Sequence, residues 1–436
     1  MSNAIPHAAP FTAPISERNT TEVPSQLDKY IFWGLAIYIT TVAFEGPVRF
    51  LLSHLKIATL LYARDLISAS IILTSLVLKR PFFENQRVQL QLLTYLLITT
   101  LFGTILLSNG FFSGLFAIKI FATFLFGIGA YTSVLVYPKR FKYATILLFS
   151  ITVLSVLINK FYVYPWEGSA FESAFGATDM SRVWWISGGE RRLSGFTRAS
   201  PVAAGIIAIL GAAMLISVKN YWLRLLLIIT GTVGIYLTTS KGWLIAYAAI
   251  SAICVFPIKS ALRDLSGKSM VTFFFLVSVL APLCSWIAKP GYSFFRSSPS
   301  ILSSFADRMS NTWPKTVDGF DHWYNWLVGQ GLGGVGLPSM FSGISAADYT
   351  VVDNLHLFLM SNFGLIGTAL FTCFYLRLLR HSNNQRDLSN AAFAVGLMGL
   401  SYGVVTNIAD DSFSPIALGI AWGLLSQPKE VHAKSD

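Results

Sequence analysis

The stretch that decides the fold is LFLMSNFGLIGTALFTCF, which covers residues 357–374 and contains no charged side chain. A helix needs about 20 mostly apolar residues to cross a bilayer. The residues just before it, Asp353-Asn354-Leu355-His356, are polar with one exception. A polar segment that ends where such an apolar run begins predicts a membrane-crossing helix whose first turn lies at the membrane surface.

Composition extends this prediction to the whole chain. The 436 residues are 54% hydrophobic and 12% charged, whereas a soluble domain carries roughly 25% charged residues. The net charge of +11 is explained first by Lys and Arg on cytoplasmic loops, and second by an anionic lipid substrate, so no nucleic acid partner is expected. The three cysteines lie in apolar runs, which excludes a disulfide framework or a cysteine metal site.

Repeated apolar runs predict an all-α, polytopic integral membrane protein with about twelve transmembrane helices. The predicted spans are 30–48, 57–78, 88–107, 115–137, 143–158, 200–218, 221–238, 243–258, 270–288, 355–376, 388–405 and 413–427.

The positions of the basic residues predict how these spans are oriented in the membrane. Lys and Arg fall in alternate connections, as at Lys79 and Arg140, and such residues concentrate on the cytoplasmic side. Both termini are therefore predicted to be cytoplasmic. The chain divides into a disordered N-terminus (1–28), a membrane domain (29–428) and a cytoplasmic tail (429–436). The first helix is expected to be retained, because it lacks the pattern of a cleaved signal peptide.

Two long connections, 159–199 and 289–354, fall on the outer side of the membrane and are expected to contain short helices. Both carry several Lys and Arg residues, against the orientation bias. A bound anion would explain these residues, and so would salt bridges with acidic residues of the same loops.

The first of these loops holds Arg191, Arg192 and Arg198, followed by Ser200-Pro201. A hydroxyl residue and a proline in this order start a helix. Helix N-termini attract anions, and arginine forks match phosphate oxygens. These residues predict a phosphate site. The alternative is that the arginines reach lipid headgroups at the membrane surface.

Other polar features are less specific. The segment Thr238–Gly242 joins two spans and offers Lys241 to a ligand, or is only a tight turn. The glycine-rich run Gly329–Gly336 lacks the preceding strand and the Lys-Ser/Thr end of a nucleotide loop, so it predicts a close approach of backbones. Arg64-Asp65 lie within the second span, where charges indicate function or neutralise each other.

Two acidic features belong to the outer side. Asp353 and His356 are one helical turn apart, and a carboxylate beside an imidazole suits a general base. Alternatively, Asp353 only caps the helix. The adjacent pair Asp410-Asp411 forms at most a weak metal site.

These pieces, taken in order, resemble the O-antigen ligase and polymerase superfamily of bacterial membrane glycosyltransferases. Arg192–Phe196 is similar to its Arg-x-x-Gly-aromatic segment, and Ser240–Gly242 to its Ser-Arg-Gly turn, with Lys in place of Arg. Arg308, Trp313 and Gly329–Gly336 match its large outer loop. The likeness in hydropathy covers nearly the whole chain.

The last matching piece departs from the family. Asn354, Gly364 and Gly367 fit a frame in which a histidine precedes the asparagine, but this chain has Asp353 there, with His356 three residues later. The base is therefore Asp353 or His356. The histidine is slightly favoured because its ordinary pKa suits proton transfer near neutral pH.

The resemblance implies an inverting, metal-independent O-antigen ligase, without a cofactor, at the periplasmic face of a Gram-negative inner membrane. It would transfer a glycan from undecaprenyl diphosphate to a sugar hydroxyl of lipid A–core, completing lipopolysaccharide among membrane lipids. His356, Asp353 and Arg308 would be catalytic. The diphosphate and the other substrate groups would contact Arg191, Arg192, Arg198, Lys241, Asn354, Asp410 and Asp411.

Three alternatives remain at this point. An O-antigen polymerase would extend the lipid-linked glycan by the same chemistry, and a protein O-oligosaccharyltransferase would use a Ser or Thr acceptor. A lipid-glycan transporter belongs to a different class and would more often show paired half-repeats and broken midplane helices. Charges on one face and the lack of a visible repeat favour an enzyme.

Overall fold

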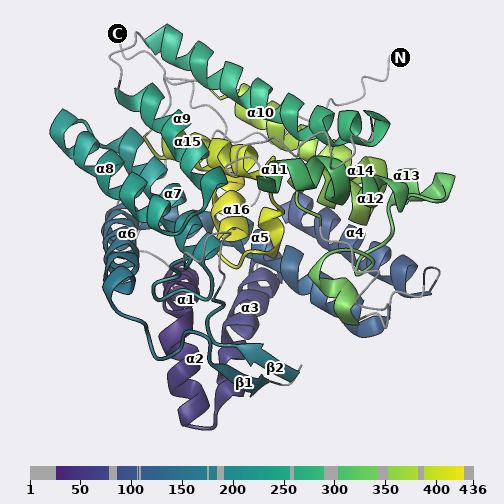
Figure 1. Cartoon of the computed structure of the whole chain (residues 1–436), viewed down its shortest axis with the longest axis horizontal. Helices are drawn as coiled ribbons and strands as arrows, with labels where there is room; N and C mark the ends of the chain where they lie inside the picture. The colour runs from purple at the N-terminus through teal and green to yellow at the C-terminus, as the bar shows by residue number, and fades with distance from the viewer. Residues whose placement is uncertain are drawn as a thin grey trace, which may run out of the picture.

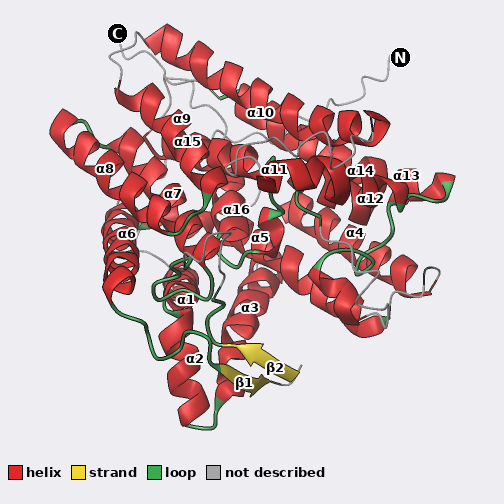
Figure 2. Ribbon diagram, viewed as in Figure 1, coloured by secondary structure: helices red, strands yellow, loops and turns green. Residues whose placement is uncertain are grey.

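A computed structural model describes residues 26–77, 86–105, 107, 110–173, 176–183, 191–255, 260–288, 303–341, 352–381 and 387–426. The described chain is almost entirely helical (Figure 2), which confirms the all-α class. One antiparallel hairpin of two short strands, in the first outer loop, was not predicted. The predicted tail 429–436 and most of the N-terminal segment 1–28 lie outside the described residues, and the first helix begins at Gln26.

The longer helices are α1 (Gln26–Ala43), α2 (Glu45–His54), α3 (Ala63–Val77), α4 (Gln86–Ile105), α5 (Phe111–Val136), α6 (Pro138–Phe161), α7 (Ser200–Ser217), α8 (Tyr221–Leu237), α9 (Lys241–Val255), α10 (Ser260–Ala288), α14 (Leu355–Leu379), α15 (Asp387–Gly403) and α16 (Ser414–Leu425). The shorter elements are η1 (Ala58–Tyr62), β1 (Ala170–Ser173), β2 (Gly176–Asp179), α11 (Ser303–Asp307), the π-helical turn η3 (Arg308–Thr312), α12 (Trp313–Asp318), α13 (Trp323–Val328), η4 (Leu337–Phe341) and η5 (Ile408–Asp410).

Within the described residues, each of the twelve predicted apolar runs overlaps one or two of these helices. Among the described residues, six helical segments are long and apolar enough to cross a membrane, or seven if the bent pair α1–α2 counts as one span. Helices α8, α9 and α16 are apolar but shorter. The chain therefore has the helices of a membrane protein, while the count of twelve crossings stays a prediction.

The first predicted span, 30–48, is not one straight helix. Helices α1 and α2 meet at an angle of 86°, and Phe44 between them has a non-helical backbone. Pro47 supplies the reason, because a proline ring clashes with the carbonyl four residues earlier and lacks an N–H. The N–H of Gly46 instead donates to the carbonyl of Phe196, at 2.8 Å.

The centre of the molecule is built from α5, α7, α15 and α16 (Figure 1). Helices α5 and α16 touch backbone to backbone, because Gly127 and Gly419 lie opposite each other. A Cβ added at Gly419 would meet the Phe124 carbonyl oxygen at 2.2 Å and the Gly127 Cα at 2.9 Å. Small residues allow such close approach of helices in membrane proteins.

Helix α14 is interrupted at Gly364, whose φ of +59° is outside the helical range. The C-terminal end of α13 fits against this break. A Cβ at Gly364 would lie 2.3 Å from the Leu327 carbonyl carbon, and one at Gly329 would lie 2.6 Å from the Asn362 carbonyl carbon. The glycine-rich run was predicted to allow close backbone approach, and this is confirmed. It fixes the second outer loop onto α14.

The backbone contact between α5 and α16 at Gly127 and Gly419 gives the first testable prediction. Gly419→Ala should destabilise the protein by about 1–3 kcal/mol, because the added Cβ has backbone rather than side chains to displace. Thermal unfolding of the purified protein in detergent measures this effect. Gly234→Ala is the control, since its Cβ would meet only side-chain methyl groups at 3.0 Å or more. Equal melting temperatures for the two variants would contradict the close backbone packing of α5 against α16.

Candidate functional site

The short helices of the second outer loop cover the start of α14 (Figure 1). Trp313 is fully buried in a small apolar cluster with Val352 and Phe358. Its indole Nε1 donates to the carbonyl oxygen of Asp353 at 3.3 Å. This packing holds the turn that carries Arg308 against Asp353, two residues before the start of α14.

Arg308 and Asp353 form an ion pair, with Nη2 and Oδ2 separated by 3.2 Å. The guanidinium also donates through Nη1 to the carbonyl oxygen of Ser304, at 2.9 Å. The two side chains remain 18% and 30% exposed, so a ligand can reach both. Burial raises the pKa of Asp353, and the Arg308 charge opposes that rise.

Asp410 is the second carboxylate of this cluster. It lies in η5, close enough for the charge of Asp353 to act on it, and Gly336 of the glycine-rich run packs against its Oδ2. Its Oδ1 is shielded from solvent and has no hydrogen-bond partner among the described residues. Burial raises the pKa of Asp410 from 3.8 to about 7; the Asn407 hydrogen bond opposes this, and the Asp353 charge adds to it.

Arg192 joins the cluster from the first outer loop. Burial lowers its pKa, the Tyr402 hydroxyl opposes this effect, and the nearby Arg308 charge adds to it. Tyr402 stands at the end of α15, where its hydroxyl is a hydrogen-bond partner of Ser240 and its ring stacks on Trp243 at 4.0 Å. The turn that contains Lys241 therefore borders the same cluster, because Gly242 also packs against the Tyr402 ring.

Two other arginines of the first loop face elsewhere. Arg191 pairs with Glu167, Nη1 to Oε2 at 2.8 Å, and donates to the carbonyl oxygen of Asn159 at 2.6 Å. It ties the loop to the end of α6. Arg198 lies among the charges of Glu45 and the arginines around it. Of the three predicted diphosphate ligands in this loop, only Arg192 comes near Arg308.

Asn354 is fully buried and acts as a structural clamp. Its Oδ1 accepts from the N–H of Leu357 at 2.9 Å, which caps α14. Its Nδ2 donates to the carbonyl oxygens of Ser278 and Val404, at 3.1 and 3.0 Å. With these three bonds the amide links α14 to α10 and to the end of α15, so it positions the site rather than offering donors to a ligand.

His356 and Asp411 also have partners of their own. The imidazole is buried, with Nε2 3.3 Å from the Thr368 hydroxyl and the ring against Phe371. It has no contact with Arg308, although the sequence slightly favoured it as the base. Asp411 accepts from the N–H groups of Phe413 and Ser414, at 3.0 and 3.2 Å, and so caps α16.

An apolar cavity of about 160 Å³ adjoins the charged cluster. Its walls come from α4, α5, α14 and α16, and η5 contributes Ala409, the neighbour of Asp410. The lining combines aliphatic side chains with several aromatic ones, among them Tyr95, Phe121, Phe363, Phe371 and Trp422. A ligand with a charged head and an apolar tail would find both environments side by side.

Tyr402 is the residue of the cluster that the sequence did not single out. It lies near the outer end of the predicted span 388–405, where aromatic residues are common in any membrane protein, so no distinctive signal marked it. Among the residues that the structure describes, no group of three or more His, Cys, Asp or Glu side chains could hold a metal ion.

Comparison of the chain with protein-family models, with curated proteins and with solved structures found no match.

The raised pKa of Asp410 predicts how stability depends on pH. An acid with a raised pKa holds its proton more tightly when folded, so stability falls as the pH rises from about 4 to about 7. Asp410→Asn removes this effect and should raise the melting temperature by several degrees at pH 8, and by little at pH 4. Asp321→Asn, at an exposed carboxylate, should leave the pH dependence unchanged. A parallel shift of the Asp410→Asn protein at both pH values would contradict the assignment.

Proposed function

We propose that the chain is a glycosyltransferase of the O-antigen ligase type, which transfers a glycan from undecaprenyl diphosphate to a sugar hydroxyl of lipid A–core. One observation carries this proposal. Arg308 and Arg192, from two separate outer loops, meet two half-buried carboxylates, Asp353 and Asp410, beside an apolar cavity. The cations suit a diphosphate, the carboxylates suit proton transfer, and the cavity suits a polyprenyl chain.

The proposed reaction uses Asp410 as the general base. Its pKa of about 7 is near the optimum for proton transfer at neutral pH, and one of its oxygens is unpartnered among the described residues. Asp353 is less suited, since Arg308 holds it in an ion pair. The acceptor hydroxyl gives its proton to Asp410 while its oxygen forms a bond to the anomeric carbon. The bond from that carbon to the diphosphate oxygen breaks, and the configuration inverts.

Arg308 and Arg192 would stabilise the charge that grows on the leaving diphosphate. Preorganised donors of this kind act most strongly where water is excluded. In this proposal they supply the positive charge that a metal ion supplies in other glycosyltransferases. The distribution of Lys and Arg predicts that the reaction side faces away from the cytoplasm, and the resemblance to the O-antigen ligases implies that this side is the periplasm of a Gram-negative inner membrane.

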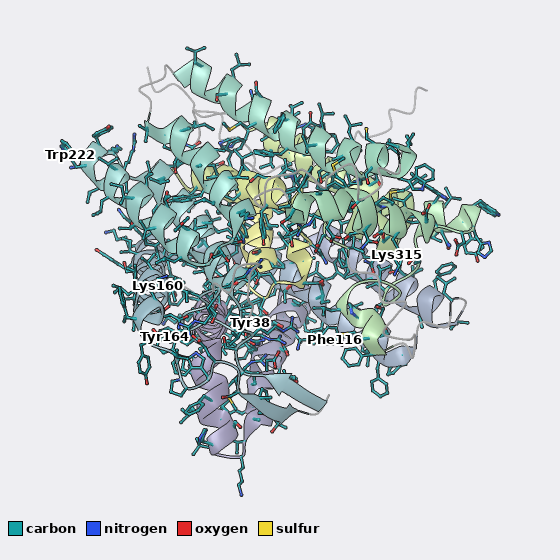
Figure 3. All side chains as sticks on the ribbon, in the orientation of Figure 1. Tyr38, Phe116, Lys160, Tyr164, Trp222 and Lys315 are labelled. Carbon is teal, nitrogen blue, oxygen red and sulfur yellow. The ribbon has the colours of Figure 1, made fainter. Side chains whose placement is uncertain are left out.

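The proposal predicts that Arg308→Ala lowers transfer by about a hundred- to a thousandfold, the usual cost of losing one donor to a developing charge. The assay supplies purified protein with undecaprenyl-diphosphate-linked glycan and lipid A–core, and follows glycan on lipid A–core. Lys315→Ala is the matched control, because this exposed lysine of the same loop (Figure 3) lies outside the cluster. Near-normal transfer by the Arg308→Ala protein would refute the proposal.

The same assay tests the class of reaction. Longer glycan on the lipid carrier, with none on lipid A–core, would mean a polymerase instead of a ligase. No transfer to either acceptor by a well-folded wild-type protein would remove the enzyme proposal.

A separate prediction concerns the base. Asp410→Asn should lower the rate by about a hundred- to ten-thousandfold, whereas His356→Phe should keep a rate close to that of the wild type, since His356 does not reach Arg308. The wild-type rate should rise as the pH increases through about 7, because Asp410 must lose its proton to act. Loss of transfer in a folded His356→Phe protein, with the pH profile of Asp410→Asn unchanged, would show that the imidazole is the base.

A further inference from the structure

A second charged cluster lies around Glu45, between the α1–α2 bend, the start of α3 and the first outer loop. Glu45 is 1% exposed. Its carboxylate accepts from Arg49, with Nε 2.9 Å from Oε1, and pairs with Arg64, Nη1 to Oε2 at 3.3 Å. Tyr38, labelled above the β1–β2 hairpin in Figure 3, has its ring under the Arg64 guanidinium at 5.8 Å.

The other carboxylates around this cluster are also occupied. Asp65 pairs with Lys119 at 2.7 Å and with the Nε of Arg64 at 4.0 Å. Asp179, at the end of the hairpin, pairs with Arg182 at 3.7 Å and is largely exposed. The pair Arg64-Asp65 was predicted to be either functional or mutually neutralised, and Glu45 is in fact the closer partner of Arg64.

Arg198 is the cation of this cluster for which the described residues supply no side-chain partner. Its side chain has no hydrogen bond or ion pair with a described residue, and its Nε is shielded from solvent. The charges acting on it are one carboxylate, Glu45, and three guanidinium groups, those of Arg49, Arg182 and Arg64. Burial is the main reason that its pKa is lowered, to about 10.

Arg64, by contrast, is engaged by Glu45. Its Nη1 lies 3.3 Å from Oε2, and its Nη2 donates to Oε1 at 3.4 Å. Buried guanidinium groups without acceptors are costly. In this cluster it is therefore the shielded Nε of Arg198 for which the described chain supplies no acceptor.

The surroundings indicate the depth of this cluster in the membrane. Helix α2 and the turn after it expose large apolar side chains, namely Leu51, Leu55, Ile57 and Leu60. Apolar exposure next to buried arginines is typical of the level of lipid headgroups.

We infer that Arg198, beside the paired Glu45 and Arg64, forms a binding site for a phosphate group, separate from the cluster at Arg308. Guanidinium forks match the oxygens of phosphate monoesters and diesters, and the excess of cations over carboxylates favours an anion. The phosphate is that of a lipid headgroup or a free phosphate ion. The inference does not depend on the proposed glycosyl transfer, because it concerns binding at other residues.

The test uses the full chain in detergent, as the wild type and as the Arg308→Ala variant. The variant removes phosphate binding at the proposed catalytic cluster, so that binding at Arg198 is measured separately. Melting temperature and binding are measured with inorganic phosphate, with dioctanoyl phosphatidic acid, and with dioctanoylglycerol as the matched neutral lipid. We expect stabilisation by phosphatidic acid or by both anions, and none by dioctanoylglycerol. Stabilisation by phosphatidic acid alone identifies a headgroup site, whereas a response to phosphate as well identifies a site for the free ion.

Three variants then test whether the anion binds at Arg198. Arg198→Gln should bind the anion at least about tenfold more weakly, while Arg198→Lys should retain part of the binding. Arg140→Gln, at a guanidinium that lies over Tyr137 and Phe32, is the control and should bind normally.

The stability of the protein without a ligand distinguishes an anion-binding role of Arg198 from a purely structural role. Removing an unpaired buried cation should leave the Arg198→Gln protein at least as stable as the wild type when no anion is present. A clearly lower melting temperature under those conditions would mean that Arg198 holds the fold together, and would overturn the inference. Wild-type anion binding by Arg198→Gln, or no binding of either anion by the wild-type protein, would also overturn it.

Discussion

Three helices meet at the side-chain amide of Asn354, and the charged cluster at Arg308 depends on that junction. The amide caps α14 and donates to the backbones of α10 and the end of α15. Leaving such a buried donor or acceptor without a partner would cost about 1–3 kcal/mol each, so the junction is held in one geometry. Asp353 precedes this residue directly, and Arg308 is paired with Asp353. The position of the charged cluster therefore follows from the clamp beneath it.

The first outer loop distributes its arginines to three different places within eight residues. Gly195 allows this, because its φ of +59° turns the chain where a Cβ would collide with the Ser155 hydroxyl at 2.4 Å. Before the turn, Arg191 anchors the loop to α6 and Arg192 approaches Arg308. After it, Arg198 reaches the Glu45 cluster. The apparent basic motif is thus three separate electrostatic contacts rather than one anion site.

Hydropathy was sufficient to predict the helices, because each apolar run of the sequence must satisfy its own backbone hydrogen bonds in a low-dielectric environment. The bend after Ala43 was predictable in principle from Pro47, but residues 30–48 are apolar enough as a whole, despite Glu45, to be predicted as one span. The β1–β2 hairpin has too few residues for a recognisable strand pattern.

The residue types that form the site could be predicted from the sequence, but their arrangement in space could be predicted only in part. Arg308, Asp353 and Asp410 were all identified, since charged residues next to membrane spans are few. Spacing could not show that Asn354 and Asp411 are occupied by backbone groups. Nor could it show which way His356 faces from its helix. Tyr402 was missed because its role depends on a neighbour, Ser240, that is 162 positions away in the chain (402 − 240).

The glycine contact between α5 and α16 has a consequence for access to the apolar cavity. These two helices form adjacent walls of that cavity, and their backbones touch with no side chain between them. A side chain can swing aside to admit a long flexible molecule, whereas a backbone contact opens only if whole helices separate. The contact at Gly127 and Gly419 therefore closes this corner of the cavity, and the walls that side-chain movement alone could open are those of α4 and α14.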